Sequence, residues 1–207
     1  MPRVKVPRKS TAIDMTAMCD VAFLLLTFFI LTATARQPEP LPVDTPSSTT
    51  KIKQPDKNIA TLTIGDGGKV FFGVTENNVR VRTLEKMSER YSASFTPADK
   101  KRFSLMESFG VPVGNLKQVI NMSSDQRNKP GLQTGIPLDS VGDQASELHY
   151  WILNARYAAK ELNNTSLRFS IKGDSKEEYP TIKKIIDMLQ RQEVNKFSLI
   201  TALEGEN

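Results

Sequence analysis

The pattern of apolar and polar positions separates one continuous apolar run from a longer region of short periodic segments. Residues 15–35 read MTAMCDVAFLLLTFFILTATA and contain a single formal charge. At about 1.5 Å of rise per residue, a helix of this length spans the roughly 30 Å hydrocarbon layer of a bilayer. The run therefore predicts one transmembrane helix over residues 15–35.

Beyond Ile59 the periodicity is that of short strands and amphipathic helices. Apolar residues over 59–64 and 70–72 flank the glycine-rich segment 65–68, which predicts a β-hairpin. This segment lacks the lysine of a phosphate-binding loop, so we expect a simple turn. Four further elements are predicted in the order helix, strand, helix, strand, over residues 146–162, 167–171, 180–192 and 197–201. Together they indicate an α+β sheet domain over residues 59–207.

A proline-rich segment separates the apolar run from this domain. Residues 36–58 contain five prolines and a run of serine and threonine. Such composition favours extended, solvated conformers. We expect a linker without a packed element, and an inert spacer in preference to a docking motif.

The domain itself is interrupted by a long segment over residues 75–145. Its predicted elements are a helix, a second helix and a loop, over residues 96–109, 115–122 and 123–142. The first helix is predicted to begin at Thr96-Pro97-Ala98-Asp99 and to end before Gly110. A long irregular insertion of this kind carries a partner surface or is mobile.

Charge is unevenly distributed along the chain. The first nine residues carry four cations and no acid, namely Arg3, Lys5, Arg8 and Lys9, whereas the region after Arg36 is nearly balanced. This bias predicts that residues 1–14 form a cytoplasmic basic arm and that everything after Arg36 lies on the other side of the membrane. No cationic cluster covers a folded domain, so a nucleic-acid partner is not expected.

A cleavable signal peptide is the main alternative for the apolar run. A basic start, an apolar core and an Ala33-Thr34-Ala35 ending also fit such a peptide. Asp20 argues against cleavage, because a carboxylate in the span costs about 2.5 to 3.5 kcal/mol at a helix centre, and somewhat less near the boundary. A signal peptide gains nothing from that cost.

Asp20 belongs to a polar stripe on the predicted helix. At about 100° per residue, Thr16, Asp20, Thr27 and Thr34 fall within a sector of roughly 40°. Hydrocarbon offers this stripe no hydrogen bonds, so we expect it to face a partner helix or a hydrated path. The alternative is that Asp20 reaches the headgroups and that the threonines bond to carbonyls of their own helix.

Candidate chemistry elsewhere is sparse. His149 is the single histidine and Cys19 the single cysteine, so we expect no metal site, no cofactor and no intrachain disulfide. No Ser-His-Asp or Cys-His arrangement is evident, and we do not expect an enzyme. Tyr150 and Trp151 stand at helical spacing that favours core packing over partner contact.

Residues 13–29, read as IDMTAMCDVAFLLLTFF, resemble the membrane segment of the ExbD/TolR biopolymer-transport family, and ExbD most closely. In that family an acid, a threonine, a short apolar step and an Asp-Val pair open a leucine-rich span. By position, Asp20 matches the family's proton-carrying aspartate. The chain departs from the pattern at Ala17, where proline is common, and at Cys19, where an aliphatic residue is common. Within the linker, only Leu41-Pro42 resembles the family's Leu-Pro motif.

The resemblance implies a subunit of a proton-motive-force-driven inner-membrane motor with an enlarged periplasmic domain. Paired ExbD-like helices would sit inside a ring of ExbB-like helices, and a TonB-like protein would carry force to outer-membrane transporters. Three alternatives remain open, namely a TolR-like envelope-maintenance subunit, a flagellar-stator-like subunit, and a membrane-tethered periplasmic binding module. The last would use the helix only as an anchor.

Overall fold

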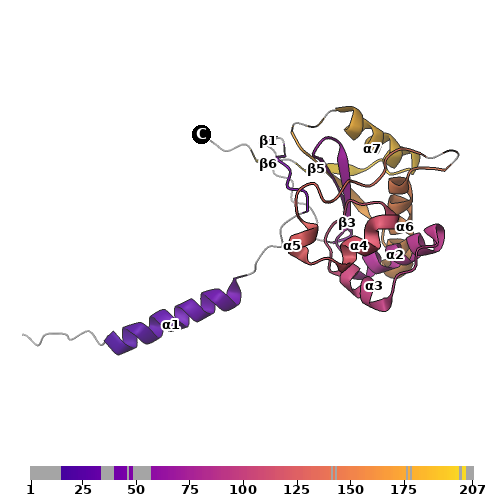
Figure 1. The fold of residues 1–207 in the computed structure, drawn as a ribbon. Coiled ribbons are helices and arrows are strands. Elements are labelled where there is room, and N and C mark those ends of the chain that lie inside the picture. The colour runs from indigo at the N-terminus through magenta and orange to yellow at the C-terminus, as the bar shows by residue number, and fades with distance from the viewer. Residues whose placement is uncertain are drawn as a thin grey trace, which may run out of the picture. The chain divides into compact units, whose positions relative to one another are not determined.

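The computed structural model describes residues 15–33, 40–45, 47–48, 57–140, 142, 144–175, 177, 179–200 and 202–203. The chain divides into two compact units, Met1–Gln37 and Pro38–Asn207. Among the described residues, the first unit contains one helix and the second contains the strands (Figure 1).

The first unit is built on α1, Met15–Thr32, a helix of 18 residues. By length and composition it is able to cross a membrane, which confirms the predicted helix over these residues. At about 1.5 Å per residue it is about 27 Å long. Position Thr34 of the predicted helix lies outside the described residues.

The second unit is organised around a four-stranded sheet in the order β3-β2-β4-β5. These strands are β2 (Ile59–Gly65), β3 (Lys69–Val74), β4 (Arg168–Gly173) and β5 (Phe197–Ile200). The β2–β3 pair is antiparallel, and β4 runs parallel to both β2 and β5. In register, Leu62 pairs with Phe72 on one side and with Ile171 on the other. The α+β prediction and its hairpin are confirmed.

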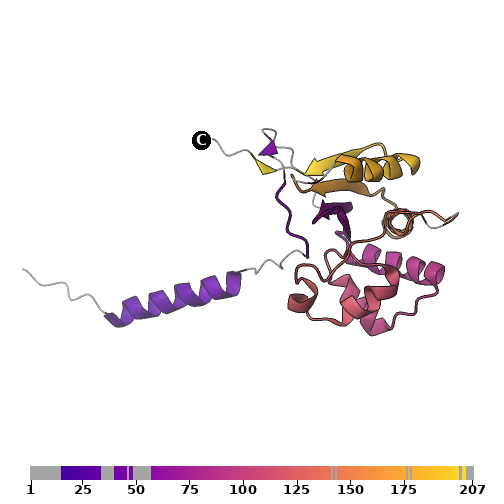
Figure 2. The same cartoon turned by 45° about the horizontal axis from the view of Figure 1, so that its top comes forward.

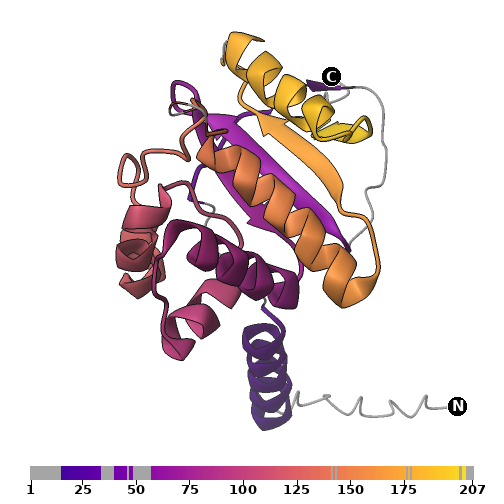
Figure 3. The same cartoon turned by 90° about the vertical axis from the view of Figure 1, so that its right-hand side faces the viewer.

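Two long helices cover one face of this sheet, as Figure 3 shows. They are α6 (Glu147–Asn163) and α7 (Tyr179–Arg191), close to the predicted ranges. The Ser146 side chain caps α6 by accepting from the His149 amide at 3.3 Å, and Asn164 ends the helix in the left-handed region. Because α7 joins two parallel strands, it serves as the crossover that such a pair requires.

Trp151 forms the centre of the core. Its side chain is fully buried, and its ring lies 4.7 Å from Phe109, 6.3 Å from Phe103 and 6.5 Å from Phe72. The prediction that it packs in the core is confirmed. Tyr150 is half-buried and packs against this core, and the Arg90 guanidinium lies 3.3 Å from its ring centroid.

The insertion folds into four helices, which Figure 2 shows on the opposite side of the domain from α7. They are α2 (Asn77–Tyr91), α3 (Pro97–Ser104), α4 (Val113–Asn121) and α5 (Ser124–Arg127). The prediction missed α2 and placed α5 in a loop, although a capping box of Ser123 and Gln126 starts α5. A capping box of Thr96 and Asp99 starts α3 where predicted.

The predicted extension of α3 to Phe109 is wrong, because residues 105–109 leave the helix to pair with the sheet. The Phe72 amide donates to the Phe109 carbonyl at 2.8 Å, and the Phe109 amide returns the bond at 3.0 Å. The Ile136 amide adds a bond to the Val70 carbonyl at 2.9 Å. Pairing satisfies polar groups that an edge strand would otherwise leave open, so the insertion protects the β3 edge.

Arg80 fastens this insertion to the sheet. Its side chain is only 9% exposed and donates to four backbone carbonyls, those of Val74, Thr75, Ser104 and Met106. The bonds to Thr75 and Ser104 are both 2.8 Å long. Burial lowers the pKa of the Arg80 guanidinium, and the charges of Glu107 and Glu76 partly oppose that effect. One buried cation therefore joins β3, α2 and the segment after α3.

Part of the predicted linker packs on the domain, contrary to the expectation that it forms no packed element. Leu41 is 9% exposed, and a Cβ built on Gly65 would meet Leu41 and Val43. The Ser175 amide donates to the Asp44 carbonyl at 2.8 Å. In addition, β1 (Ser47–Ser48) pairs in parallel with β6 (Ala202–Leu203). Proline content disfavours regular ladders, but it does not prevent a single leucine from burying its side chain against a glycine.

Candidate functional site

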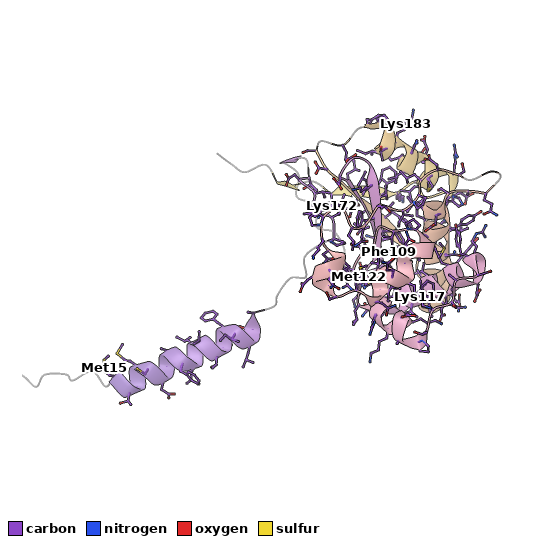
Figure 4. All side chains as sticks on the ribbon, viewed as in Figure 1. Met15, Phe109, Lys117, Met122, Lys172 and Lys183 are labelled. Carbon is purple, nitrogen blue, oxygen red and sulfur yellow. The ribbon has the colours of Figure 1, made fainter. Side chains whose placement is uncertain are left out.

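The helix α1 positions the one ionisable side chain predicted to act in the membrane. Asp20 lies in its second turn, five residues after Met15 and directly after Cys19. Most of the other residues of the helix are apolar, chiefly leucine, phenylalanine and alanine, and they gain stability in an apolar environment. Figure 4 shows the side chains of α1 projecting along the whole helix from Met15 onward.

Asp20 and two threonines share one face of α1. At about 100° per residue, Thr16, Asp20 and Thr27 fall within a sector of roughly 40°. The Thr27 hydroxyl donates to the Leu24 carbonyl of its own helix at 2.9 Å. For Thr27 the alternative of bonding within the helix therefore holds. Thr32, which lies outside the stripe, bonds in the same way to Phe28 at 2.7 Å.

On this face, Asp20 is the residue whose side chain has no hydrogen-bond partner among the described residues. Within the part of the chain that the structure describes, no hydrogen bond or ion pair reaches its carboxylate. An ionised carboxylate in hydrocarbon requires a partner, water or a proton. Asp20 must therefore obtain one of these from outside the described chain if α1 spans a bilayer.

The rest of α1 also lacks protein cover. None of its residues is buried, and Leu31 is 86% exposed. The exposed large apolar side chains of the helix are Met15, Met18, Val21, Phe23, Leu24, Leu25, Leu26, Phe28, Phe29, Ile30 and Leu31. An apolar surface of this extent requires lipid or neighbouring helices.

His149 occupies a structural position on α6. Its Nδ1 lies 3.0 Å from Gln192 Nε2, and its carbonyl accepts from the same amide at 3.0 Å. Burial lowers the pKa of His149, and the cations Arg90 and Arg191 lower it further. Among the described residues, no group of three or more His, Cys, Asp or Glu side chains is placed to hold a metal ion.

Glu147 is a semi-buried carboxylate that the sequence analysis did not identify. Its Oε1 accepts from the Val113 amide at 2.8 Å and from Trp151 Nε1 at 3.2 Å, so it joins the start of α4 to α6. Burial raises the pKa of Glu147, although both hydrogen bonds act in the opposite direction. Removal from water therefore outweighs the two donors.

Glu147→Gln should become more favourable for stability as pH rises. A carboxyl whose pKa is raised by folding gives its full stability below the unfolded pKa and loses part of it as pH rises through the folded pKa. Glutamine keeps an acceptor for both donors and does not titrate. We expect the difference in Tm, variant minus parent, to grow from about pH 4 to about pH 7. Thermal unfolding of the full chain in detergent, followed by fluorescence of the single tryptophan, measures it. A difference that is constant or shrinks with pH would contradict the assignment.

Comparison with known proteins gives one match. The family described as "Biopolymer transport protein ExbD/TolR" matches residues 7–204 of the 207-residue chain. The match covers α1 and the sheet domain, with residues 75–145 inside the matched range. No curated protein and no solved structure matches the chain.

Proposed function

Because this chain belongs to the ExbD/TolR biopolymer-transport family, we propose that it is the ExbD-type subunit of a motor driven by the proton-motive force, with Asp20 as its proton-carrying residue. Family membership supports a non-enzymatic motor subunit anchored in the inner membrane by α1. The single observation that carries the finer assignment is the carboxylate of Asp20 on an apolar, membrane-length helix without a partner among the described residues.

The proposed step is a change in the protonation of Asp20. The ionised form is costly in the bilayer, by about 2.5 to 3.5 kcal/mol at a helix centre, and protonation removes this cost. One charge crossing about 100 mV of membrane potential corresponds to about 2.3 kcal/mol. These two energies are comparable, so the membrane potential is able to change which orientation of α1 is most stable.

The proposed orientation places residues 1–14 in the cytoplasm and the sheet domain in the periplasm. Four cations stand before α1, and excess lysine and arginine mark the cytoplasmic side of a span. In this orientation the domain is free to meet proteins that act between the two membranes.

The proposed membrane partners are a ring-forming ExbB-like protein and a second copy of this chain. The uncovered apolar surface of α1 supports helix neighbours, and a pair of α1 helices would share the polar face containing Asp20. In the periplasm, a TonB-like protein would receive the motion and energise transport across the outer membrane. A TolR-like role in envelope maintenance is the second candidate, since the matched family includes both kinds.

Replacing α1 distinguishes a motor from a tethered binding module. Residues 15–32 are exchanged for an unrelated span of equal length without an ionisable residue. A motor subunit should lose transport driven by the membrane potential, whereas a module that uses α1 only as an anchor should keep it. The measurement is uptake of an outer-membrane transporter's substrate, with membrane insertion checked by fractionation. Full uptake after the exchange would refute the motor assignment.

A further inference from the structure

A cationic groove lies on the sheet domain, beside α6 and the end of α7. It has a volume of about 800 Å³ and is lined by one stripe of α6, the loop after α6, and the last residue of α7 with the segment that follows it. In Figure 3, α6 and α7 lie over the same face of the sheet. A groove of this volume is within the range of small-molecule and peptide sites.

Its charge is strongly one-sided. Four cations line it, Arg156, Lys160, Arg191 and Lys196, against the single acid Glu193. Within the described ranges, no salt bridge joins any of the four to a carboxylate, whereas Arg82 and Lys86 on α2 are paired with Glu85 or Glu161. Like charges gathered without counter-charges repel one another, and an anionic ligand would relieve that repulsion.

The lining of the groove includes a buried acceptor without a donor. Gln192 is 7% exposed. Its side-chain amide nitrogen donates to the backbone carbonyl of His149 and lies within hydrogen-bond distance of His149 Nδ1. Its Oε1 atom is buried and has no hydrogen-bond partner among the described residues. A buried acceptor left unpaired is costly, so a ligand that brings an N–H or O–H donor would satisfy it.

The remaining lining residues complete the chemistry. Arg156 Nη1 is held by the Gln192 carbonyl at 2.6 Å, which fixes this guanidinium beside the acceptor. Tyr157 and Leu153 add apolar surface, and Thr165 and Ser166 add hydroxyl groups. A ligand with carboxylates, backbone N–H donors and short apolar parts matches every one of these features. Inorganic phosphate and polar lipid headgroups supply an anion and a donor, but they offer no short apolar part to Tyr157 and Leu153.

From this combination we infer that the groove binds an acidic peptide segment of a partner protein. Asp and Glu side chains of the peptide pair with the four cations, and one peptide N–H donates to Gln192 Oε1. Arginine and lysine bind carboxylates through charge-assisted hydrogen bonds, and this binding weakens with ionic strength. The groove is separate from Asp20, and the inference does not depend on proton transfer.

The test measures peptide binding to the full chain in a non-ionic detergent by fluorescence anisotropy. The probe is a short fluorescein-labelled peptide of alternating Glu and Ala, and its reference carries Gln in place of Glu. The Glu peptide should bind at least about tenfold more tightly than the Gln peptide. The double variant Lys160→Gln/Arg191→Gln should lose about tenfold in affinity for the Glu peptide.

The matched control removes two cations outside the groove. Lys101→Gln/Lys183→Gln has the same change in net charge at two exposed positions and should alter affinity by less than about twofold. Unfolding followed by Trp151 fluorescence confirms that both variants are folded. Equal binding of the two peptides, or equal losses in the two double variants, would overturn the inference.

Two competitors separate the peptide from other anions. Inorganic phosphate at moderate concentration should not displace the Glu peptide, and vesicles containing phosphatidylglycerol should displace it no better than phosphatidylcholine vesicles. Full displacement by phosphate would make the groove a simple anion site. Selective displacement by anionic vesicles would make it a lipid site. Either result would overturn the peptide assignment.

Discussion

Asp20→Asn should reduce transport driven by the membrane potential to the level of cells that lack the chain. Asparagine is nearly isosteric with aspartate but neither ionises nor carries a proton away, so the proposed protonation step is lost while the helix keeps its shape. Loss of an essential proton carrier is expected to remove at least about 99% of the rate, a contribution typical of positioned acid–base groups. The measurement is substrate uptake in cells with and without a proton uncoupler.

The control for this variant is Thr32→Val. Thr32 lies about 120° around α1 from Asp20, outside the polar stripe, and bonds to its own helix at Phe28, so its replacement should leave uptake within about twofold. Assembly is checked by crosslinking from Cys19, an exposed thiol next to Asp20. Transport retained by a correctly inserted Asp20→Asn chain would count decisively against the proposed role.

Arg80→Met should destabilise the sheet domain by about 3 kcal/mol or more. Methionine fills much of the same space but donates no hydrogen bond, so four carbonyls that now accept from Arg80 lose their donor. Each buried group left unpaired costs about 1–3 kcal/mol. For a domain of this size we expect Tm to fall by about 6–12 °C. Thermal unfolding followed by Trp151 fluorescence measures the change.

Arg82→Met is the matched control on the same helix. Arg82 is partly exposed and pairs with Glu85 at 3.1 Å and with Glu161 at 2.7 Å. Surface ion pairs contribute about 0–1 kcal/mol, so the Tm should change by only a few degrees. If Arg80→Met changed Tm no more than Arg82→Met, Arg80 would not be the residue that fastens the insertion.

Helices and strands with a regular apolar period could be predicted from the sequence. The β2–β3 hairpin has apolar runs around a glycine turn, and α6 and α7 repeat apolar residues on one face. The helix α2 was missed because two of its five buried positions are polar, Arg80 and Thr83, which hides the period. Arg80 is buried because carbonyls outside α2 accept its hydrogen bonds, and Thr83 because its hydroxyl donates to the Val79 carbonyl of its own helix.

Contacts between segments far apart in the chain could not be predicted from the sequence. The predicted helix does not reach Phe109, because Phe109 exchanges two backbone hydrogen bonds with Phe72 instead. The residues next to Phe109 in the sequence do not indicate this partner. Leu41 likewise reads as part of a proline-rich linker until Gly65 provides space for it. Local propensity is outweighed in both cases by contacts far apart in the chain.

The candidate sites show the same division. Asp20 stands out in the sequence because a single ionisable residue within a membrane-length apolar run can be recognised without knowledge of tertiary contacts. The cationic groove does not, since Arg156 on α6 and Arg191 at the end of α7 are far apart in sequence and line one groove only in the folded domain. His149 is the one lining residue that the sequence analysis singled out, and its role in the groove is structural.

The central claim is that Asp20 takes up a proton inside the membrane. Dicyclohexylcarbodiimide reacts with protonated carboxyls in apolar surroundings, and peptide mass mapping of the chain isolated from membranes identifies the modified residue. We predict that Asp20 is modified, and that modification increases as pH is lowered. An unmodified Asp20 at every pH, or a mature chain whose first residue is Arg36, would contradict the account.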